Sequence, residues 1–139
     1  MWSRMAVDLE QRRLFGTNGV RGIVNKELTL ELVLELAQAV GTYFKGGEMV
    51  VGRDGRTSSP ALQKVAMGGL ASVGCKVYDI GQAPTPMIDF VTTNWKVDGG
   101  IAVTASHNPP EYNGIKVIAE DGIETGRDEE LEIEKIYFG

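Results

Sequence analysis

Short apolar segments alternate along this chain with polar turns and with longer segments of helical periodicity. Strands are predicted at residues 49–52, 76–80 and 100–104, and helices at 29–45, 59–74 and 85–95. Because strand, turn and helix follow one another, the connections are βα crossovers, which produce a largely parallel sheet covered by helices on both faces. The sequence therefore predicts an α/β fold of three layers, αβα, around a mostly parallel central sheet.

Three polar turns follow the predicted strands, at Arg53 to Ser59, Gly81 to Pro86 and Ala105 to Asn113. They are expected to share one rim, because ligands of such sheets bind at the carboxyl ends of the strands. Residues 114–118 are expected to return from the third turn as a further strand, with Asn113-Gly114 as the turn, which makes the sheet mixed. Residues 127–138 predict a short acidic helix.

The predicted helices carry recognisable end signals. Lys45-Gly46-Gly47 suits a left-handed cap after the first helix, and Ser59 followed by Pro60 is typical of an N-cap and first helical residue. In the third helix the apolar positions are Met87, Phe90 and Val91.

Composition excludes several classes of function. The 139 residues, 42% of them apolar, suit one domain with a real core. The net charge of −5 gives no general field for holding nucleic acid or an anionic membrane, so any anion needs a local site. The single cysteine, Cys75, is expected to be a small buried residue, and the lack of a signal peptide or membrane-length apolar run favours the cytoplasm. Residues 1–13 are expected to be a flexible leader outside the fold.

The segment TASHNPPEYNGIKV, residues 104–117, concentrates polar side chains after an apolar run. Ser106 and His107 are unsuited to be a hydrolase dyad, because neighbours in extended backbone point to opposite sides and no G-x-S-x-G elbow is present. Two prolines instead predict a rigid loop that holds one hydroxyl in place. Arg21, His107 and Lys116 would surround it with positive charge or protons, which suits a phosphate. The alternative is that Ser106 and Asn108 only form a turn.

Four motifs together resemble the N-terminal domain of the α-D-phosphohexomutases, the superfamily of phosphomannomutase, phosphoglucomutase and phosphoglucosamine mutase. They are LFGTNGVRG (14–22), VGRDGRTSSP (51–60), GQAPTP (81–86) and GGIAVTASHNPPEYNGIKV (99–117). They occur in the family's order and extend over nearly the whole chain from Leu14 onward. The resemblance implies the domain I fold of that family for residues 14–139.

By this resemblance Ser106 is the serine that carries a phosphoryl group between the 1- and 6-positions of a hexose phosphate. Lys116 matches the family's candidate general acid/base, and Arg21 matches an active-site arginine. His107 and Asn108 flank the phosphoserine, and Thr104 and Asn113 belong to the same phosphate loop. The family uses Mg²⁺, of whose ligands only Ser106 is present here, and a hexose 1,6-bisphosphate as phosphorylating activator.

The family's enzymes have four domains, and this chain resembles only the first. It contains no D-G-D-x-D-R metal loop, no G-E-x-S-G-H stretch and no R-x-S-G-T-E-P loop. We therefore expect a domain that needs the remaining domains of the mutase as partners and is inactive alone. The mannose/glucose type is the default substrate class, and phosphoglucosamine mutase, which the opening with Asn18 also resembles, is the alternative. An alternative of another class is a stand-alone module that binds a phosphate or sugar phosphate.

The sequence allows two interpretations for each of two groups of residues. Arg53, Asp54 and Arg56 form either a structural ion-pair cluster or ligand contacts on the rim. The apolar residues near the end form either a self-association surface or part of the domain's own core; they are Ile133, Ile136, Tyr137 and Phe138.

Overall fold

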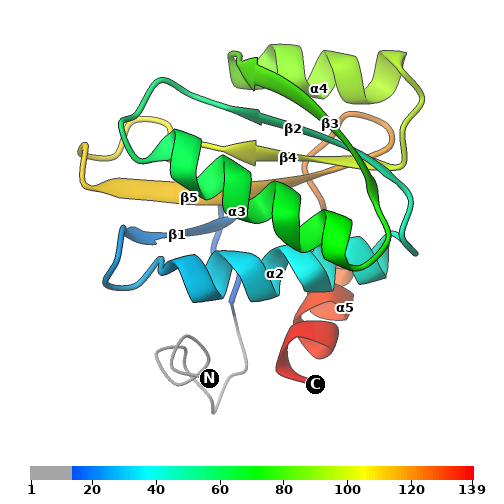
Figure 1. Ribbon diagram of the computed structural model, residues 1–139, viewed down its shortest axis with the longest axis horizontal. Coiled ribbons are helices and arrows are strands. Elements are labelled where there is room, and N and C mark those ends of the chain that lie inside the picture. The colour runs from blue at the N-terminus through cyan, green and yellow to red at the C-terminus, as the bar shows by residue number, and fades with distance from the viewer. Residues whose placement is uncertain (1–13) are drawn as a thin grey trace.

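The structure is a computed structural model that describes residues 14–139, so the expected leader at 1–13 lies outside the described residues (Figure 1). The described part contains five strands and four helices. In chain order they are β1 (Val20–Ile23), α2 (Leu30–Tyr43), β2 (Glu48–Arg53), α3 (Ser59–Ser72), β3 (Lys76–Gln82), α4 (Thr85–Asn94), β4 (Gly99–Val103), β5 (Tyr112–Ala119) and α5 (Arg127–Phe138). Each predicted strand and helix is present, with ends that differ by a few residues.

The strands form one sheet in the order β1-β5-β4-β2-β3. β2 pairs in parallel with both β3 and β4, whereas β5 runs antiparallel to both β4 and β1. β5 is therefore the one described strand that runs against the others. This arrangement confirms the predicted mostly parallel, mixed sheet.

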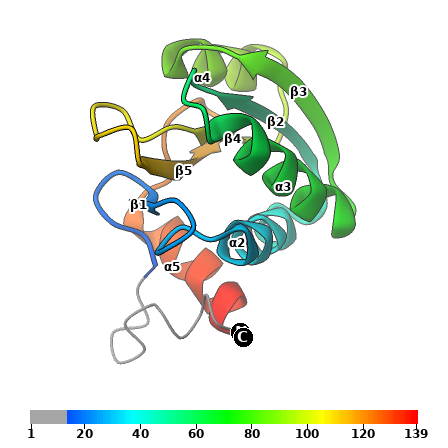
Figure 2. The ribbon, with the colours of Figure 1, turned by 60° about the vertical axis from the view of Figure 1, so that its left-hand side comes forward.

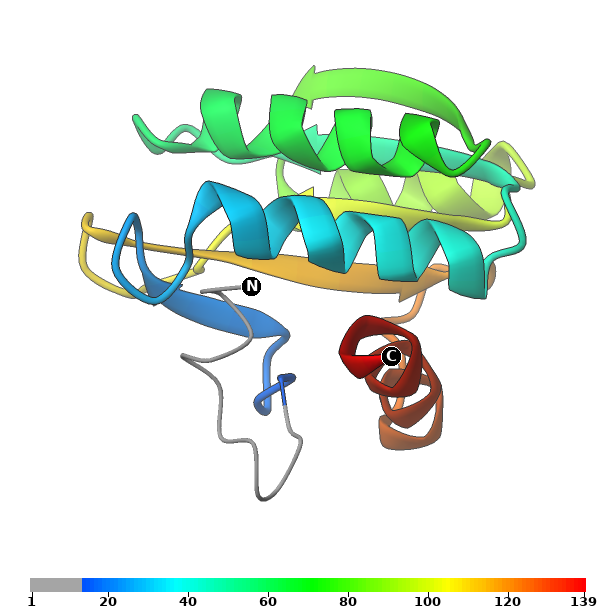
Figure 3. The ribbon, with the colours of Figure 1, turned by 60° about the horizontal axis from the view of Figure 1, so that its bottom comes forward.

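Helices cover both faces of this sheet, as Figures 2 and 3 show. α2, α3 and α5 lie on one face, where α2 packs against both α3 and α5. α4 lies on the other face against β2, β4 and β5. The three-layer prediction is confirmed.

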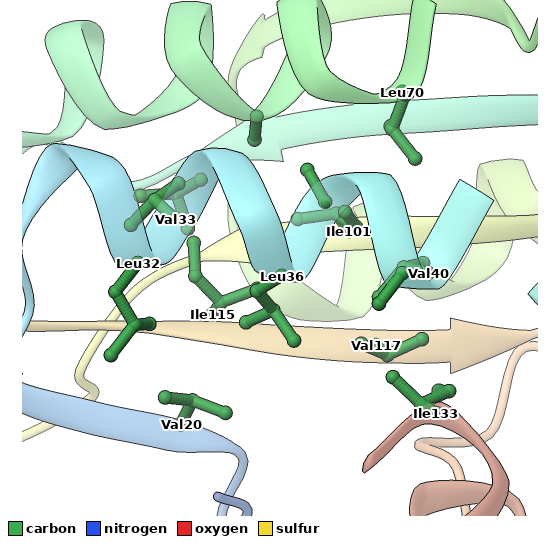
Figure 4. Packing of buried hydrophobic residues seen from close by; sticks show 14 of the residues in the cluster. Val20, Leu32, Val33, Leu36, Val40, Leu70, Ile101, Ile115, Val117 and Ile133 are labelled. Atoms are coloured by element: carbon green, nitrogen blue, oxygen red, sulfur yellow. The ribbon is translucent and has the colours of Figure 1, made fainter. Parts of the chain in front are cut away.

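The main core lies between α2 and the sheet (Figure 4). Leu36 and Val40 of α2 meet Ile115 and Val117 of β5, and Ile133 of α5 closes the same cluster. Burial of each such side chain contributes about 1.5–3 kcal/mol. The odd-numbered residues Ile115 and Val117 of β5 face α2, and their burial fixes the register of the strand. The even-numbered residues face α4.

The helix ends follow the predicted signals except at α3. Thr29 caps α2 by accepting a hydrogen bond from the Leu32 amide at 3.1 Å, and Lys45 and Gly46 after its end have positive φ. The prediction that Ser59 caps α3 is wrong, because Ser59 is the first helical residue and Ser58 precedes it as the cap. The Ser59 hydroxyl is buried and donates to Asp54 instead.

The predicted turn at Asn113-Gly114 is also wrong. Both residues lie inside β5, and the chain reverses earlier, between Thr104 and Tyr112. A Cβ on Gly114 would lie 2.8 Å from the Thr104 carbonyl oxygen and 2.8 Å from Cγ of Arg21. The glycine is needed because two chain segments and one side chain approach it closely.

The four apolar residues near the end of the chain, for which a self-association surface and the domain's own core were both open, mostly belong to the core. Ile133 and Tyr137 are buried, Phe138 packs against the same cluster, and Ile136 is 38% exposed. Their second interpretation, closure of the domain's own core, is therefore confirmed for the first three. Cys75 is buried as predicted.

Of the three apolar positions named for α4 from the sequence, Val91 packs against the core and the other two do not. Met87 and Phe90 are exposed, Phe90 by 65%, whereas Ile88 and Thr92 are buried against the sheet. Ile88 points to the sheet because Gly52 of β2 leaves room for it; a Cβ there would lie 2.8 Å from the Ile88 side chain. Among residues 14–139, no helix is both long enough and apolar enough to span a membrane.

Replacing Gly114 by alanine tests the close approach at β5. We expect Gly114→Ala to lower the free energy of unfolding by about 1–3 kcal/mol, since the new methyl group must displace backbone oxygens. Urea-induced unfolding followed by circular dichroism measures this change.

Gly68→Ala is the matched control. Gly68 lies on the exposed side of α3, and apart from its own turn of helix backbone no described atom lies within 4 Å of the place that an alanine methyl group would take. Alanine should therefore raise the free energy of unfolding by about 0.5–1 kcal/mol. Equal effects of the two substitutions would contradict the packing argument.

Candidate active site

The loop between β4 and β5 presents Ser106 at the edge of the sheet. Ser106 is exposed and has φ 54°, a left-handed conformation that is costly for a residue other than glycine. Its amide donates to the Thr104 hydroxyl at 3.1 Å. The backbone therefore holds this serine in one unusual orientation, with its side chain toward solvent.

Two cations from two strands lie beside the Ser106 hydroxyl. Arg21 of β1 approaches Oγ through Nη2 at 3.2 Å, and Lys116 of β5 approaches it through Nζ at 3.4 Å. They share one face because Arg21 is paired with Gly114, two residues before Lys116. Arg21 also donates through Nη1 to Asn108 Oδ1 at 2.7 Å.

The structure thus brings together most of the predicted site residues. Arg21, Lys116, Thr104 and Asn108 all lie around Ser106. His107 is exposed, and no side-chain hydrogen bond or ion pair joins it to the part of the chain that the structure describes.

Asn113 lies behind the loop and not beside the serine. Its side-chain amide is buried and donates to the hydroxyls of Ser58 at 2.8 Å and Ser59 at 2.9 Å. It therefore ties β5 to the start of α3. Its placement in the phosphate loop remains a prediction of the resemblance, and the geometry here is that of a support.

Arg56 holds the Ser106 loop. The sequence left open whether this residue belongs to a structural ion pair or contacts a ligand. Its guanidinium donates to the main-chain oxygens of four loop residues and forms an ion pair with Asp54 at 3.1 Å. The four acceptors are Ser106 at 2.9 Å, Asn108 at 2.8 Å, Pro109 at 2.8 Å and Tyr112 at 3.0 Å. The sequence does place this basic residue in a turn on the same rim. It does not indicate which groups the residue contacts, because the acceptors are backbone oxygens.

Asp54 anchors Arg56 and stays charged. Burial by itself would raise the pKa of its carboxyl group. Hydrogen bonds from the Ser59 hydroxyl, the Arg56 amide and the Thr104 hydroxyl, together with the charge of Arg56, hold that pKa below its usual range.

Two carboxylates lie on the same side of the sheet as Lys116. Glu124 forms an isolated antiparallel bridge with Ile118, two residues after Lys116. Burial raises the pKa of Glu124, and the charges of Lys116 and Arg21 offset part of that rise. Burial also raises the pKa of Asp89 on α4, again against the charge of Lys116. Sequence reasoning did not select these two residues, which come from separate segments.

The residues described here do not fit a Mg²⁺ site by themselves. No group of three or more His, Cys, Asp or Glu side chains converges within residues 14–139. The groups that contact Ser106 Oγ are cations, and one hydroxyl oxygen cannot hold Mg²⁺ against water. A hollow of about 440 Å³ lies elsewhere, lined by residues such as Phe44, Asp98 and Glu129.

A three-layer domain with this loop at the rim is of the phosphohexomutase domain I type. The family model described as phosphoglucomutase/phosphomannomutase, alpha/beta/alpha domain I, matches residues 12–139. The chain therefore belongs to the phosphoglucomutase/phosphomannomutase family, as its domain I.

Individual relatives agree with this assignment. The chain is similar to the phosphoglucosamine/phosphogalactosamine mutase of Sulfurisphaera tokodaii, with 56% identity over 91% of this chain and 28% of the relative. It is 47% identical to a phosphoglucomutase/phosphomannomutase of Thermococcus kodakarensis, over 91% of this chain and 29% of that protein. A solved phosphoglucomutase/phosphomannomutase family protein of Burkholderia thailandensis superposes with a TM-score of 0.80 at 30% identity, over 91% of this chain and 30% of that one. The chain thus spans less than a third of these relatives.

The lowered pKa of Asp54 predicts a specific pH dependence. Its carboxylate contributes stability that is fully present above the usual aspartate pKa of about 3.9 and is lost as the pH falls through the lower folded value. At pH 7 we expect Asp54→Asn to lower the free energy of unfolding by about 1–3 kcal/mol, because charge-assisted hydrogen bonds are lost. Urea unfolding at pH 7, 5, 4 and 3 measures whether this difference shrinks below about pH 4.

The control is Asp121→Asn. The exposed Asp121 accepts one backbone hydrogen bond from Ile123, which an asparagine oxygen also accepts, so this variant should stay close to the parent protein. A constant Asp54→Asn difference from pH 7 to pH 3 would contradict the assigned role of the Asp54 charge.

Proposed function

We propose that Ser106 is the phosphoryl carrier of a hexose-phosphate mutase and that this chain is the part of the enzyme that holds it. The observation that supports the proposal is the approach of Arg21 at 3.2 Å and Lys116 at 3.4 Å to one exposed hydroxyl. A phosphoserine carries a charge of about −1.5 to −2 at pH 7, which two neighbouring cations stabilise.

Arg21 has donors left for a phosphate. Its guanidinium has five N–H groups, of which one goes to the Asn18 carbonyl oxygen, one to Asn108 and one to Ser106 Oγ. The other two have no partner among residues 14–139, and we expect them to donate to phosphate oxygens on Ser106. Phosphoryl transfer depends mainly on positioning and on stabilisation of charge, which these contacts supply.

The proposed reaction balances without a further reactant. The bond between phosphorus and Ser106 Oγ breaks as the same phosphorus bonds to a hydroxyl of the hexose monophosphate. That hydroxyl loses a proton and Ser106 Oγ gains one, so the products are the free serine and a hexose 1,6-bisphosphate. The reverse transfer, from the other phosphate of the bisphosphate, restores the phosphoserine. Lys116 Nζ lies close enough to Oγ to exchange the proton.

The remaining domains of the mutase are the proposed partners. They would supply the carboxylates for Mg²⁺ and the groups that hold the sugar and its second phosphate. We therefore expect negligible turnover of glucose 1-phosphate by the chain alone.

The relatives favour an amino-sugar phosphate as the substrate. The 56% identical protein is named a phosphoglucosamine/phosphogalactosamine mutase, whereas the 47% identical one is named a phosphoglucomutase/phosphomannomutase. The second candidate is the mannose/glucose type. Comparing kcat/KM for glucosamine 1-phosphate and mannose 1-phosphate in the complete enzyme distinguishes them.

A binding module without chemistry is the alternative of another class. A reading frame that continues past Gly139 into an aspartate-rich metal loop would favour the mutase. A stop codon there, with sugar-phosphate binding by the chain alone in an NMR titration, would favour the module.

Mass spectrometry tests the carrier directly. The chain replaces the matching part of the Sulfurisphaera tokodaii relative in a chimera, which is incubated with glucose 1,6-bisphosphate and Mg²⁺. We expect one phosphate on the peptide that contains Ser106, and none after Ser106→Ala. A folded chimera in which Ser106 stays unmodified would overturn the proposal.

Lys116 should differ from other lysines of the chain in this assay. We expect Lys116→Met to slow transfer of the phosphoryl group about 10²–10⁴-fold, because the proton-exchanging group is lost. Lys64→Met, which changes an exposed lysine of α3, is the matched control and should keep the parent rate. Similar rates for both variants in quench-flow measurements would remove Lys116 from the mechanism.

A further inference from the structure

We infer that Arg56 is the positioning residue of the Ser106 loop: it sets where the serine lies relative to Arg21 and Lys116 without touching the phosphate. The inference rests on the proposed function and adds a residue from a different turn to it. The Arg56 side chain makes four contacts with the loop backbone and one with Asp54.

Every N–H group of the Arg56 guanidinium is used. Nη1 donates to the oxygens of Pro109 and Tyr112, and Nη2 donates to those of Ser106 and Asn108. Nε donates to Asp54 Oδ2. Because a guanidinium has five donors and all five have partners, Arg56 has none left for a phosphate.

Arg21 shows the opposite arrangement. Three of its donors have partners in the described residues, one of them Ser106 Oγ itself. The side chain of Arg56 is 14% exposed, and it contacts the main-chain oxygen of Ser106 instead of the hydroxyl. The two arginines therefore approach the same serine from different directions, with different tasks.

The loop needs such a cation because it has few hydrogen bonds of its own. Pro109 and Pro110 have no amide hydrogens, and the internal bonds of the loop include Asn108 N to Ala105 O and Tyr112 N to Pro109 O. Four carbonyl oxygens that point toward one place would leave a concentration of negative partial charge without the guanidinium. The positive φ of Ser106 also persists only where its surroundings fix it.

Arg56 is itself fixed from the other side. Asp54 accepts from its amide at 3.0 Å and from its Nε at 3.1 Å, and also accepts from the Ser59 hydroxyl. Ser59 in turn accepts from Asn113 of β5 at 2.9 Å. The turn after β2 and the loop after β4 consequently form one hydrogen-bonded unit with Arg56 at its centre.

Lysine cannot replace this arginine. An ammonium group has three donors on a single atom, whereas the four oxygens and Asp54 are arranged around a planar fork. We expect both Arg56→Met and Arg56→Lys to slow single-turnover phosphorylation of Ser106 in the chimera about 100-fold, the effect of a reacting group displaced by about 1 Å. The half-saturating concentration of glucose 1,6-bisphosphate should stay within about twofold, since Arg56 does not contact the ligand.

Arg53→Met is the matched control. Arg53 is the last residue of β2 and precedes Asp54. Within residues 14–139 its side chain donates only to the Asp54 carbonyl oxygen, at 3.3 Å, so its loss should leave the rate unchanged. Guanidinium ion added to Arg56→Ala should recover part of the lost rate, and it should leave the parent-like rate of Arg53→Ala unchanged. If Arg56→Met does not fold, Arg56→Lys replaces it in the assay, because lysine keeps the positive charge beside Asp54.

The outcomes separate this inference from the proposed function. If the parent chimera is not phosphorylated on Ser106, the proposed function fails. If the parent is phosphorylated and Arg56→Lys reaches the same rate, the positioning role is overturned while the carrier role stands. A selective loss of rate with guanidinium rescue supports the inference, and a raised half-saturating concentration at an unchanged rate would overturn it by making Arg56 a ligand contact.

Discussion

The site depends on the antiparallel position of β5 between β4 and β1. Because β5 runs back along β4, the chain can reverse within the short loop that carries Ser106. The same strand brings Lys116 to the α4 side of the sheet and pairs Gly114 with Arg21 of β1. Gly114 has no side chain where Arg21 crosses it, so the strand pairing also determines the path of the arginine. A parallel β5 would need a crossover connection, and Ser106 and Lys116 would not meet.

The sequence was sufficient for the three layers and for four of the five described strands, because the relevant signals are local; it did not predict β1 or the order of the strands. Helical periodicity located α2, and the sequence of strands and turns located the rim. The failures occurred where a residue serves a tertiary contact: Ser59 has the composition of a cap but bonds to Asp54, and Gly114 has the composition of a turn but lies in a strand. Periodicity contains no information about such contacts.

The candidate site was predicted only in part, because motifs select side chains and do not show which backbone atoms those side chains contact. Motif resemblance selected Ser106, Arg21 and Lys116, and the geometry brings these side chains together. It also selected Asn113, which lies behind the loop against Ser58 and Ser59. The contacts of Arg56 depend on where four carbonyl oxygens lie, and every residue type has a carbonyl oxygen. No pattern of side chains could have singled them out.

The phosphoryl carrier that we propose for this chain has two conflicting requirements. Its hydroxyl must be exposed to meet a sugar phosphate, yet exposed loops with few buried contacts open easily. In this chain the serine is exposed, while the contacts that fix its backbone lie beneath it, on an arginine that is 14% exposed. The contacts that hold the loop therefore come from Arg56 and leave the Ser106 hydroxyl exposed to solvent. Arg21, two of whose N–H groups have no partner among the described residues, lies on that open side, so the two arginines divide the work: Arg56 holds the loop backbone and Arg21 faces the hydroxyl.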